Sequence, residues 1–306
     1  MIKIIFFDID GTLRPFETGV IPEKSRQAIR AARESGILTC IATGRHWLEL
    51  HTENLIDHLP FDAFVTLDGN YCYILPEGSS TRQHSRIFGS ASAALPADDC
   101  YFDPQYGTVL HKSPIPQHTI RTLADFLSEH SFPVIFEEER RIYVNYVNDD
   151  LRRSFDAIHS PIPELGLIED ALENPIYMLI PILPYADSLH LSARLPECQI
   201  VRWSDGLSFD LTPRGIDKVY GVDRVLQHYG IDRSETAAIG DGLNDIDMLR
   251  HVGLGIAMGN AKDECKQAAD YVAPHILSDG LSHAVELILE RNRREGRYAP
   301  GTGAVF

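Results

Sequence analysis

Two pairs of acidic residues, near opposite ends of the chain, have types and spacing suited to chemistry. Asp8 and Asp10 come directly after a short apolar run, and Asp241 and Asp245 follow a second apolar run and a glycine. Carboxylates at the ends of buried strands would repel one another, each pair about 4 Å apart costing roughly 4 kcal/mol at an effective dielectric constant near 20. A hard divalent cation with oxygen ligands relieves such repulsion. The pairs therefore predict a Mg²⁺ site formed by Asp8, Asp10, Asp241 and Asp245, with Asp241 in direct contact.

The first pair also suits attack on phosphorus. A rigid Asp8 carboxylate beside Mg²⁺ is a competent nucleophile, and an aspartyl-phosphate would divide one difficult step into two easier ones. Asp10 can project to the same side if the extended geometry continues through Ile9. From there it could protonate the leaving-group oxygen and then activate water. The competing interpretation, that both residues cap the next helix or turn, loses weight because phosphate-binding candidates also occur.

Those candidates lie at two further points of the chain. Thr43 ends an apolar run and offers a hydroxyl, with the backbone amide of Gly44 beside it. Lys218 opens a predicted helix and supplies a point charge that also partly neutralises Asp8. Groups of this kind bind the equatorial oxygens of a transferring phosphoryl group. Arg45 lies beside them and suits either substrate binding or pairing with a core carboxylate.

Hydrophobic patterns at both ends of the chain predict alternating strands and helices. This alternation favours a doubly wound, Rossmann-like α/β core formed by residues 1–83 and 213–306, with its ligand site at the carboxyl ends of the strands. The expected strands cover residues 3–7, 37–42, 64–67, 236–239, 254–258 and 271–273, and the expected helices cover residues 21–35, 217–229, 244–251 and 281–290.

The middle of the chain, residues 84–212, has a different pattern, which predicts a smaller α+β domain inserted into the core as a cap. The run Glu137–Arg141 is interpreted as a solvated hairpin tip, and residues 291–306 as a poorly packed tail. The expected helices of the insertion cover residues 117–130, 149–159 and 186–195, and its expected strands cover residues 133–136, 142–147, 176–182, 199–203 and 207–211.

Taken together, these residues resemble the motifs of the haloacid dehalogenase superfamily of aspartate-nucleophile phosphotransferases. The resemblance extends over the whole core and is closest to the Cof-type branch, in which a large α/β cap lies between the threonine and lysine motifs. The motifs are Asp8-x-Asp10-Gly11-Thr12, Thr43, Lys218, Gly240-Asp241-x-x-Asn244-Asp245, and Gly255–Ala261 followed by Asp279-Gly280.

The resemblance implies a division of labour in the site. Asp8 would be the nucleophile and Asp10 the acid/base. The metal would be held by Asp8, the Asp10 carbonyl and Asp241. Phosphate would be bound by Thr43 and Lys218, with Asn244 nearby.

One position departs from the family pattern. Relatives usually have Ser-Asn-Gly-Ala after the third strand, whereas this chain has Leu67-Asp68-Gly69-Asn70. The acid at Asp68 adds negative charge near the cap hinge. It could repel an anionic leaving group or favour one that carries hydroxyl or amine donors, so Asp68 is a candidate substrate contact.

Composition limits the partners and the location. The chain has 306 residues and a net charge of −16, which argues against a nucleic acid or an anionic membrane surface as partner but admits an anionic small molecule at a metal site. The apolar runs are shorter than the roughly 18–20 residues of a membrane span, and the N-terminus lacks a secretion-signal pattern. The five cysteines are scattered, which is typical of reduced thiols in the cytoplasm.

The function that these features favour is Mg²⁺-dependent hydrolysis of small phosphate monoesters, with sugar phosphates as the leading class. A sugar-phosphate phosphomutase uses the same intermediate and stays an alternative. A non-enzymatic phospho-accepting signalling module also clusters aspartates, a Thr and a Lys around Mg²⁺. Such modules lack a large inserted cap and need no acid/base two residues after the nucleophile, so both features count against that alternative.

Overall fold

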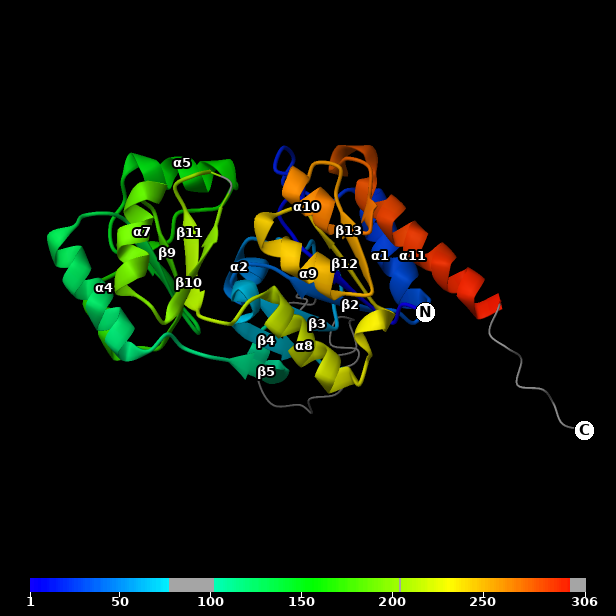
Figure 1. Ribbon diagram of the computed structural model, residues 1–306, viewed down its shortest axis with the longest axis horizontal. Helices are drawn as coiled ribbons and strands as arrows, with labels where there is room; N and C mark the ends of the chain where they lie inside the picture. The colour runs from blue at the N-terminus through cyan, green and yellow to red at the C-terminus, as the bar shows by residue number, and fades with distance from the viewer. Residues whose placement is uncertain (77–101, 204, 298–306) are drawn as a thin grey trace, which may run out of the picture.

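The computed structural model describes residues 1–76, 102–203 and 205–297, which form two β-sheets with helices packed against them (Figure 1). One sheet, at the right of Figure 1, is built from both ends of the chain, and the other, at the left, from the middle. The chain crosses between them after β5 (Thr108–Lys112) and after β11 (Phe209–Pro213). The predicted Rossmann-like core with an α+β cap is therefore confirmed.

The core sheet has the strand order β14-β13-β12-β1-β2-β3-β4-β5. Its strands are parallel from β14 to β3, and β4 and β5 continue it antiparallel. The residues that follow β1, β2 and β12 therefore emerge at the same edge of the sheet. Besides β5, the strands are β1 (Ile4–Phe7), β2 (Leu38–Ala42), β3 (Ala63–Thr66), β4 (Tyr71–Ile74), β12 (Thr236–Gly240), β13 (Leu254–Ala257) and β14 (Tyr271–Val272).

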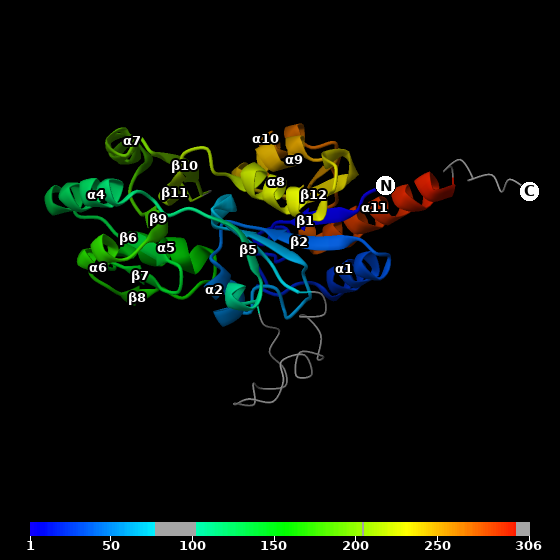
Figure 2. The ribbon, with the colours of Figure 1, turned by 90° about the horizontal axis from the view of Figure 1, so that it is seen from below.

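Helices cover both faces of the core sheet, as the fully apolar β1 requires. Ile5 and Phe7 join one buried cluster with α1 and α11, whereas Ile4 and Phe6 join another with α8 and α9. Figure 2 shows α8, α9 and α10 on one side of this sheet and α1 and α2 on the other. These helices are α1 (Glu23–Glu34), α2 (Trp47–Thr52), α8 (Lys218–Tyr229), α9 (Ile246–His251), α10 (Asp263–Ala268) and α11 (Gly280–Arg297).

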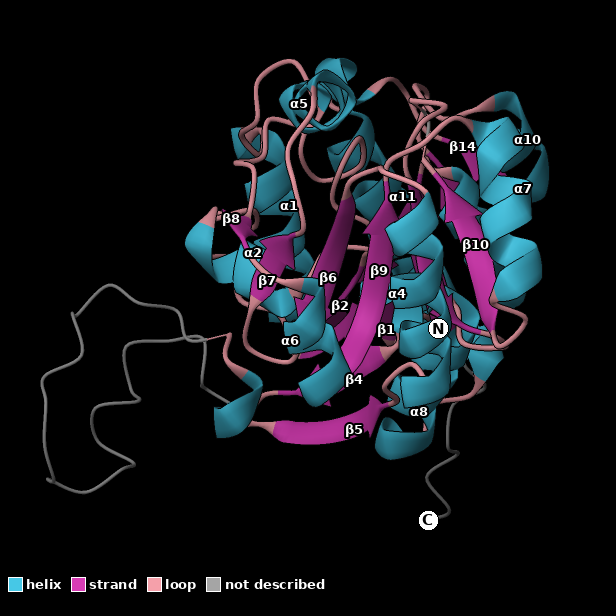
Figure 3. Cartoon of the chain, turned by 90° about the vertical axis from the view of Figure 1, so that its left-hand side faces the viewer, coloured by secondary structure: helices cyan, strands magenta, loops and turns pink. Residues whose placement is uncertain are grey.

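The cap sheet has the order β10-β11-β9-β6-β7-β8, and its neighbours are antiparallel except β7 and β8. Figure 3 looks onto this sheet with α4 and α6 in front of it. The opposite face turns Ile135, Met178 and Ile180 toward the core. Besides β11, the cap contains β6 (Val134–Glu138), β7 (Ile142–Val144), β8 (Glu164–Leu165), β9 (Ile176–Pro181), β10 (Cys198–Arg202), α4 (Gln117–Glu129), α5 (Asp149–Ala157), α6 (Ile168–Glu173) and α7 (Tyr185–Arg194).

Two expectations about boundaries differ from the structure. Strand β5 pairs with β4 in the core sheet, so the core extends well past the expected cap boundary at residue 84. Helix α11 continues to Arg297, past the expected helix end at residue 290, and Asn292 hydrogen-bonds both the backbone N–H and the carbonyl of Ile2. The first part of the predicted tail is therefore helical, although most of its side chains are exposed, and residues 298–306 lie outside the described chain.

Candidate active site

The carboxyl ends of β1 and β12 bring three carboxylates together. Asp8 follows β1 and Asp241 follows β12, its parallel neighbour. One oxygen each from Asp8, Asp241 and Asp245 lie within 4.8 Å of one another. Burial raises the pKa of Asp8 well above its ordinary value, and Asp245 raises it further. Burial and Asp245 also raise the pKa of Asp241 to about 7. The repulsion expected from the sequence is present, and an all-oxygen site of this kind suits a hard divalent cation.

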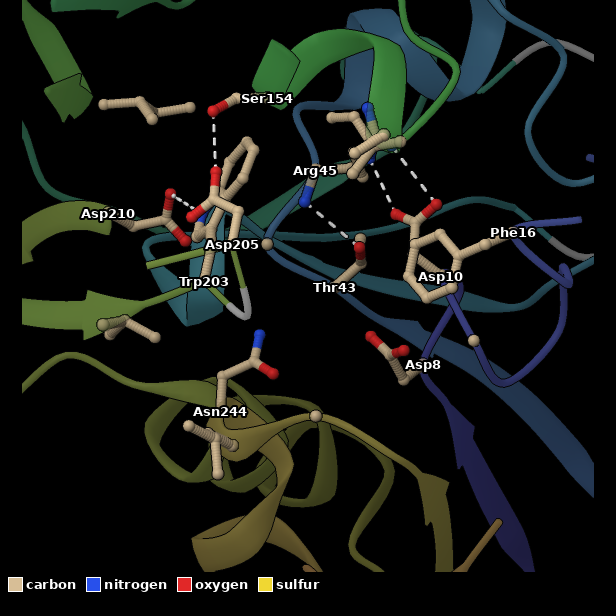
Figure 4. A pocket seen from close by; sticks show the side chains of 18 of the residues that line it. Asp8, Asp10, Phe16, Thr43, Arg45, Ser154, Trp203, Asp205, Asp210 and Asn244 are labelled. Atoms are coloured by element: carbon tan, nitrogen blue, oxygen red, sulfur yellow. Dashed lines mark hydrogen bonds and ion pairs between the residues drawn. The ribbon is translucent and has the colours of Figure 1, made fainter. Parts of the chain in front are cut away.

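Lys218 supplies the positive charge of the cluster. It begins α8 directly after the N-cap Asp217 and is 1% exposed. Its Nζ donates to Asp8 Oδ1 at 2.9 Å and to Asp245 Oδ1 at 2.7 Å. Burial lowers the pKa of Lys218, but the carboxylates of Asp245 and Asp8 outweigh burial and hold it above its ordinary value. Lys218 therefore fixes one oxygen of Asp8, whose side chain faces the cavity (Figure 4).

Asp245 and Asp241 differ in how their oxygens are used. Asp245 Oδ2 accepts hydrogen bonds from the backbone N–H groups of Asp241 and Gly242, at 3.0 and 2.9 Å, and its Oδ1 accepts from Lys218. Asp241 Oδ1 accepts from the hydroxyl of Thr12 at 2.8 Å. Asp245 thus orients the loop that presents Asp241, which leaves Asp241 better suited than Asp245 to direct contact with a metal.

The turn after β1 needs glycine. Gly11 has φ +88°, and a Cβ there would lie 2.3 Å from Asp241 Oδ2. Asn260 donates from Nδ2 to the Gly11 carbonyl at 2.7 Å, which fixes this turn against the loop after β13. Asn260 is not among the site residues that the sequence predicts. Its place in the Gly255–Ala261 motif is the signal that could have identified it.

Arg45 is placed against carboxylates. Its guanidinium donates two hydrogen bonds to Asp10, from Nε to Oδ2 at 2.7 Å and from Nη2 to Oδ1 at 3.2 Å (Figure 4). Its Nη1 donates to Glu49 Oε1 at 3.1 Å and to Ser160 Oγ, a cap residue, at 2.5 Å. Burial lowers the pKa of Arg45, but Asp10 and Glu49 outweigh burial and raise it above its ordinary value. Of the two predicted roles, the structure shows the carboxylate pairing, although Arg45 also lines the cavity.

Thr43 and Gly44 line the cavity beside the acidic cluster. Thr43 follows β2, which neighbours β1, and is 2% exposed. Its Oγ1 accepts a hydrogen bond from the backbone N–H of Arg45 at 3.1 Å. The accepting role leaves the hydroxyl proton to donate to another oxygen. The structure thus brings Thr43 and Gly44 to the edge of the sheet that carries Asp8.

Asp68 connects the core to the cap. Leu67 and Asp68, in the 3₁₀ turn η1 (Leu67–Gly69), have φ of 52° and 49°, a left-handed backbone that non-glycine residues rarely adopt. Asp68 Oδ1 accepts from Asn244 Nδ2 at 3.0 Å, its Oδ2 has no hydrogen-bond partner among the described residues, and the Asp210 carboxylate of β11 lies nearby. Burial raises the pKa of both acids. Asp68 is 1% exposed, whereas Asn244 and Asp210 line the cavity.

A cavity of about 470 Å³ separates the acidic cluster from the cap sheet. None of the cap residues that line this cavity is among the site residues that the sequence predicts. Their functional signal is weak, because apolar strand residues look the same whether they line a cavity or fill a core. The residues that the cap contributes include Ile135, Glu137, Met178, Ile180, Trp203 and Asp210.

The run Glu137–Arg141 forms the predicted hairpin tip between β6 and β7, with Arg140 exposed, but Glu137 itself is not solvated. Glu137 is 2% exposed and lines the cavity. The backbone carbonyls of Glu138 and Glu139 accept hydrogen bonds from His46 Nε2 at 2.8 Å and Trp47 Nε1 at 2.9 Å. The hairpin between β6 and β7 therefore docks on the start of α2 in the core.

The docking at His46 predicts a pH-dependent stability. His46 Nδ1 accepts from the Leu48 N–H, so Nε2 must carry the proton given to Glu138. A second proton on Nδ1 would clash with the Leu48 N–H. Burial also disfavours the charged imidazolium and lowers the pKa of His46 from 6.5 to about 4. The unfolded chain therefore binds this proton more readily. The contribution is intact above pH 6.5 and decreases as the pH falls toward 4, by about 3 kcal/mol in all.

This prediction is checked by urea unfolding at pH 7, 6 and 5. We expect His46→Gln to be less stable than the wild type at pH 7 and to lose less stability on acidification. His190→Gln, the same change at an exposed position of α7, is the control and should keep the wild-type pH dependence. An unchanged pH dependence in His46→Gln would contradict the prediction.

The fold and the site together define a class of protein. Carboxylates, a lysine and a threonine meet at one edge of a largely parallel sheet, and the cap sheet lies across the cavity from them (Figures 1 and 4). Within the described residues, every helix is too short or too polar to cross a bilayer. This is the arrangement of a capped phosphotransfer enzyme that acts on small molecules.

Comparison with known proteins identifies the family. The sequence model of the haloacid dehalogenase-like hydrolases matches residues 5–88 and 100–285, so the chain belongs to that family. The putative phosphatase YkrA of Bacillus subtilis is 29% identical over 286 residues, covering 93% of this chain and 96% of YkrA. The solved structure of BT4131, described as a subclass IIB sugar phosphatase, is 33% identical, with a TM-score of 0.73, covering 94% of this chain and 98% of BT4131.

A third relative is named for a different substrate. The 5-amino-6-(5-phospho-D-ribitylamino)uracil phosphatase YcsE of Bacillus subtilis is 26% identical over 284 residues, covering 93% of this chain and 94% of YcsE. The family and its relatives identify the protein as a phosphoric monoester hydrolase that acts on small phosphate esters. Phosphatases of this family generally use a divalent metal, which agrees with the acidic cluster.

Proposed function

We propose that the protein is a Mg²⁺-dependent phosphatase of small phosphate monoesters, chiefly sugar phosphates, that works through an aspartyl-phosphate on Asp8. The observation that carries this proposal is the placement of Asp8. Lys218 holds one oxygen of its buried carboxylate at 2.9 Å, the side chain faces the cavity, and Asp10 lies beside it. A carboxylate oriented in this way is a nucleophile rather than a cap of the following turn.

The donor set fits magnesium. The candidate ligands are the carboxylates of Asp8 and Asp241 and the carbonyl of Asp10, with Asp245 behind Asp241. Oxygen donors alone are what Mg²⁺ prefers. When bound, the ion would neutralise charge on the phosphoryl oxygens. Thr43, Gly44, Lys218 and Asn244 are the proposed phosphate-binding groups, since they lie in or against the cavity at the Asp8 end.

In the first step, an Asp8 oxygen forms a bond to phosphorus while the bond from phosphorus to the leaving oxygen breaks. Protonated Asp10 gives its proton to that oxygen, which departs as an alcohol. In the second step, Asp10 takes a proton from water as the water oxygen bonds to phosphorus. The acyl-phosphate bond then breaks, which releases phosphate and restores Asp8. Arg45 positions Asp10 for both transfers through its two hydrogen bonds.

The sugar-phosphate class is supported by the name of BT4131, a sugar phosphatase 33% identical to this chain, and by the acids that line the cap side of the cavity. Carboxylates such as Asp210 and Glu137 accept hydrogen bonds from the donors that a sugar carries. We place the enzyme in the cytoplasm, because four of its cysteines are free thiols: Cys40, Cys72, Cys198 and Cys265.

Removal of metal is the first test. The purified protein should release phosphate from p-nitrophenyl phosphate with Mg²⁺ and lose all measurable turnover in EDTA, and added Mg²⁺ should restore it. The reason is that the carboxylates of Asp8, Asp241 and Asp245 repel the anionic phosphoryl group unless a cation lies between them and it. Turnover that persists in EDTA at the wild-type rate would contradict the proposed metal dependence.

A further inference from the structure

Glu137 is a buried acid of the cap that takes no part in the proposed bond-making and proton-transfer steps. It lies on β6, is 2% exposed, and lines the cavity. Its Oε2 has no hydrogen-bond partner among the described residues. Buried carboxylate oxygens are nearly always satisfied, and one that is not costs free energy. A site built in this way is completed by something that enters the cavity.

The neighbours of Glu137 on the cap sheet do not supply a donor. In the register of β6, β9 and β11, Glu137 pairs with Met178, and Ile135 pairs with Ile180. Asp210 is the other acid on this face, and it already accepts a hydrogen bond from Trp203 Nε1 at 2.8 Å. The face is therefore apolar around one satisfied acid and one unsatisfied acid.

The charges that surround Glu137 are mostly negative. Burial raises the pKa of Glu137 well above its ordinary value, and Glu49, Asp210 and Asp68 raise it further, whereas Arg45 lowers it. Arg45 donates four side-chain hydrogen bonds in the structure, to Asp10, Glu49 and Ser160, and none of them to Glu137. Around the whole cavity eight carboxylates face three Lys or Arg side chains, an excess that the anionic phosphate of a substrate cannot reduce.

An uncharged donor and a cation would affect this site differently. A hydroxyl group can donate one hydrogen bond to Oε2 but leaves the excess negative charge in place. A protonated amine donates the hydrogen bond and compensates the charge, and hydrogen bonds between charged groups are the stronger kind. The apolar side chains of Ile135, Met178 and Phe155 can contact the carbon skeleton that carries the amine.

We propose that Glu137 binds a protonated amine on the leaving group, so that the preferred substrates are amino-bearing phosphate monoesters such as amino-sugar phosphates. The inference rests on the proposed function, because the phosphate must occupy the Asp8 end of the same cavity. The two ends of the cavity then bind groups of opposite charge. Lys218 and the metal take the phosphate, and Glu137 takes the ammonium group.

The test compares matched substrates that differ in the amine alone. The pairs are glucosamine 6-phosphate with glucose 6-phosphate, and O-phosphoethanolamine with 2-hydroxyethyl phosphate. For at least one pair we expect kcat/KM to favour the amine by about 10- to 100-fold. In Glu137→Gln that ratio should fall to near one. N-acetylglucosamine 6-phosphate, which keeps the N–H without the charge, should lose the preference in the wild type.

Glu138→Gln is the matched control. Glu138 is the next residue of β6, does not line the cavity, and undergoes the same change of carboxylate to amide. It should keep the wild-type ratio. The proposal is overturned if neither pair favours the amine, or if the preference survives in Glu137→Gln. Hydrolysis of p-nitrophenyl phosphate by the wild type tests the proposed phosphatase function separately from the proposed amine preference. If the wild type did not hydrolyse it, the proposed function itself would be overturned.

Discussion

Asp8→Asn is expected to lower kcat for p-nitrophenyl phosphate by at least ~10⁴-fold, because an amide cannot form the acyl-phosphate. The shape of the site should be retained. The remaining amide oxygen can still accept the Lys218 hydrogen bond that Asp8 Oδ1 accepts at 2.9 Å. The loss should therefore lie in kcat, with a smaller change in KM. Phosphate release by variant protein freed of wild-type enzyme is the measurement.

The stability of Asp8→Asn distinguishes lost chemistry from lost fold. Burial and Asp245 disfavour the ionised form of Asp8, so removing its charge should leave the metal-free melting temperature unchanged or higher. The rise in melting temperature on adding Mg²⁺ should shrink, since one ligand is weakened. Asp247→Asn is the control, because that side chain is 75% exposed on α9 and should behave as wild type. A well-folded Asp8→Asn enzyme with substantial Mg²⁺-dependent turnover would show that Asp8 is not the nucleophile.

The core site could be predicted because its geometry is local. In a parallel sheet, the residues after each buried strand emerge at one edge, so the short segments that contain Asp8, Thr43 and Asp241 locate the site by themselves. The structure brings together the residues that this rule selected. The structure also distinguishes their roles, because the oxygens of Asp245 accept hydrogen bonds from Lys218 and from the backbone of the loop that presents Asp241.

The cap side could not be predicted in the same way. Whether Glu137 is a solvated tip or a buried wall of the cavity depends on the core surface that β6 meets, and that surface is far away in the sequence. His46 and Trp47 hold the hairpin against the core by donating hydrogen bonds to the backbone carbonyls of Glu138 and Glu139. Contacts to backbone carbonyls cannot be predicted from the pattern of side chains in the sequence. Strand β5 was missed for a related reason, because its pairing with β4 is antiparallel and needs no apolar run.

The same contacts explain why the cap and the acid/base are linked. Arg45 bonds Asp10 in the core and Ser160 in the cap, and Ser160 Oγ donates to Glu53 Oε2 at 2.9 Å. The carboxylate that moves protons is therefore oriented by a guanidinium that also contacts the cap. Arg45 therefore links the position of the cap to the placement of Asp10.

Asp10→Asn is expected to lower kcat by about 10²- to 10⁴-fold, the usual contribution of a general acid/base. Asparagine can accept one hydrogen bond from Arg45, but its amide nitrogen opposes the second guanidinium donor, and it carries no transferable proton. Both proton transfers should suffer, and the deficit should depend on the leaving group. It should be larger for an alkyl phosphate, whose alcohol needs the proton, than for p-nitrophenyl phosphate, whose anion leaves readily.

Rapid mixing separates the two transfers. With p-nitrophenyl phosphate, Asp10→Asn should still form the acyl-phosphate, so a burst of p-nitrophenol close to the enzyme concentration should precede slow turnover. Arg45→Lys is the control for positioning, since it keeps a positive charge and leaves Asp10 able to carry protons while losing the two-bond grip. It should slow alkyl and aryl substrates by similar factors and show no burst. If Asp10→Asn instead slows both substrates equally and shows no burst, its role is to orient the site rather than to move protons.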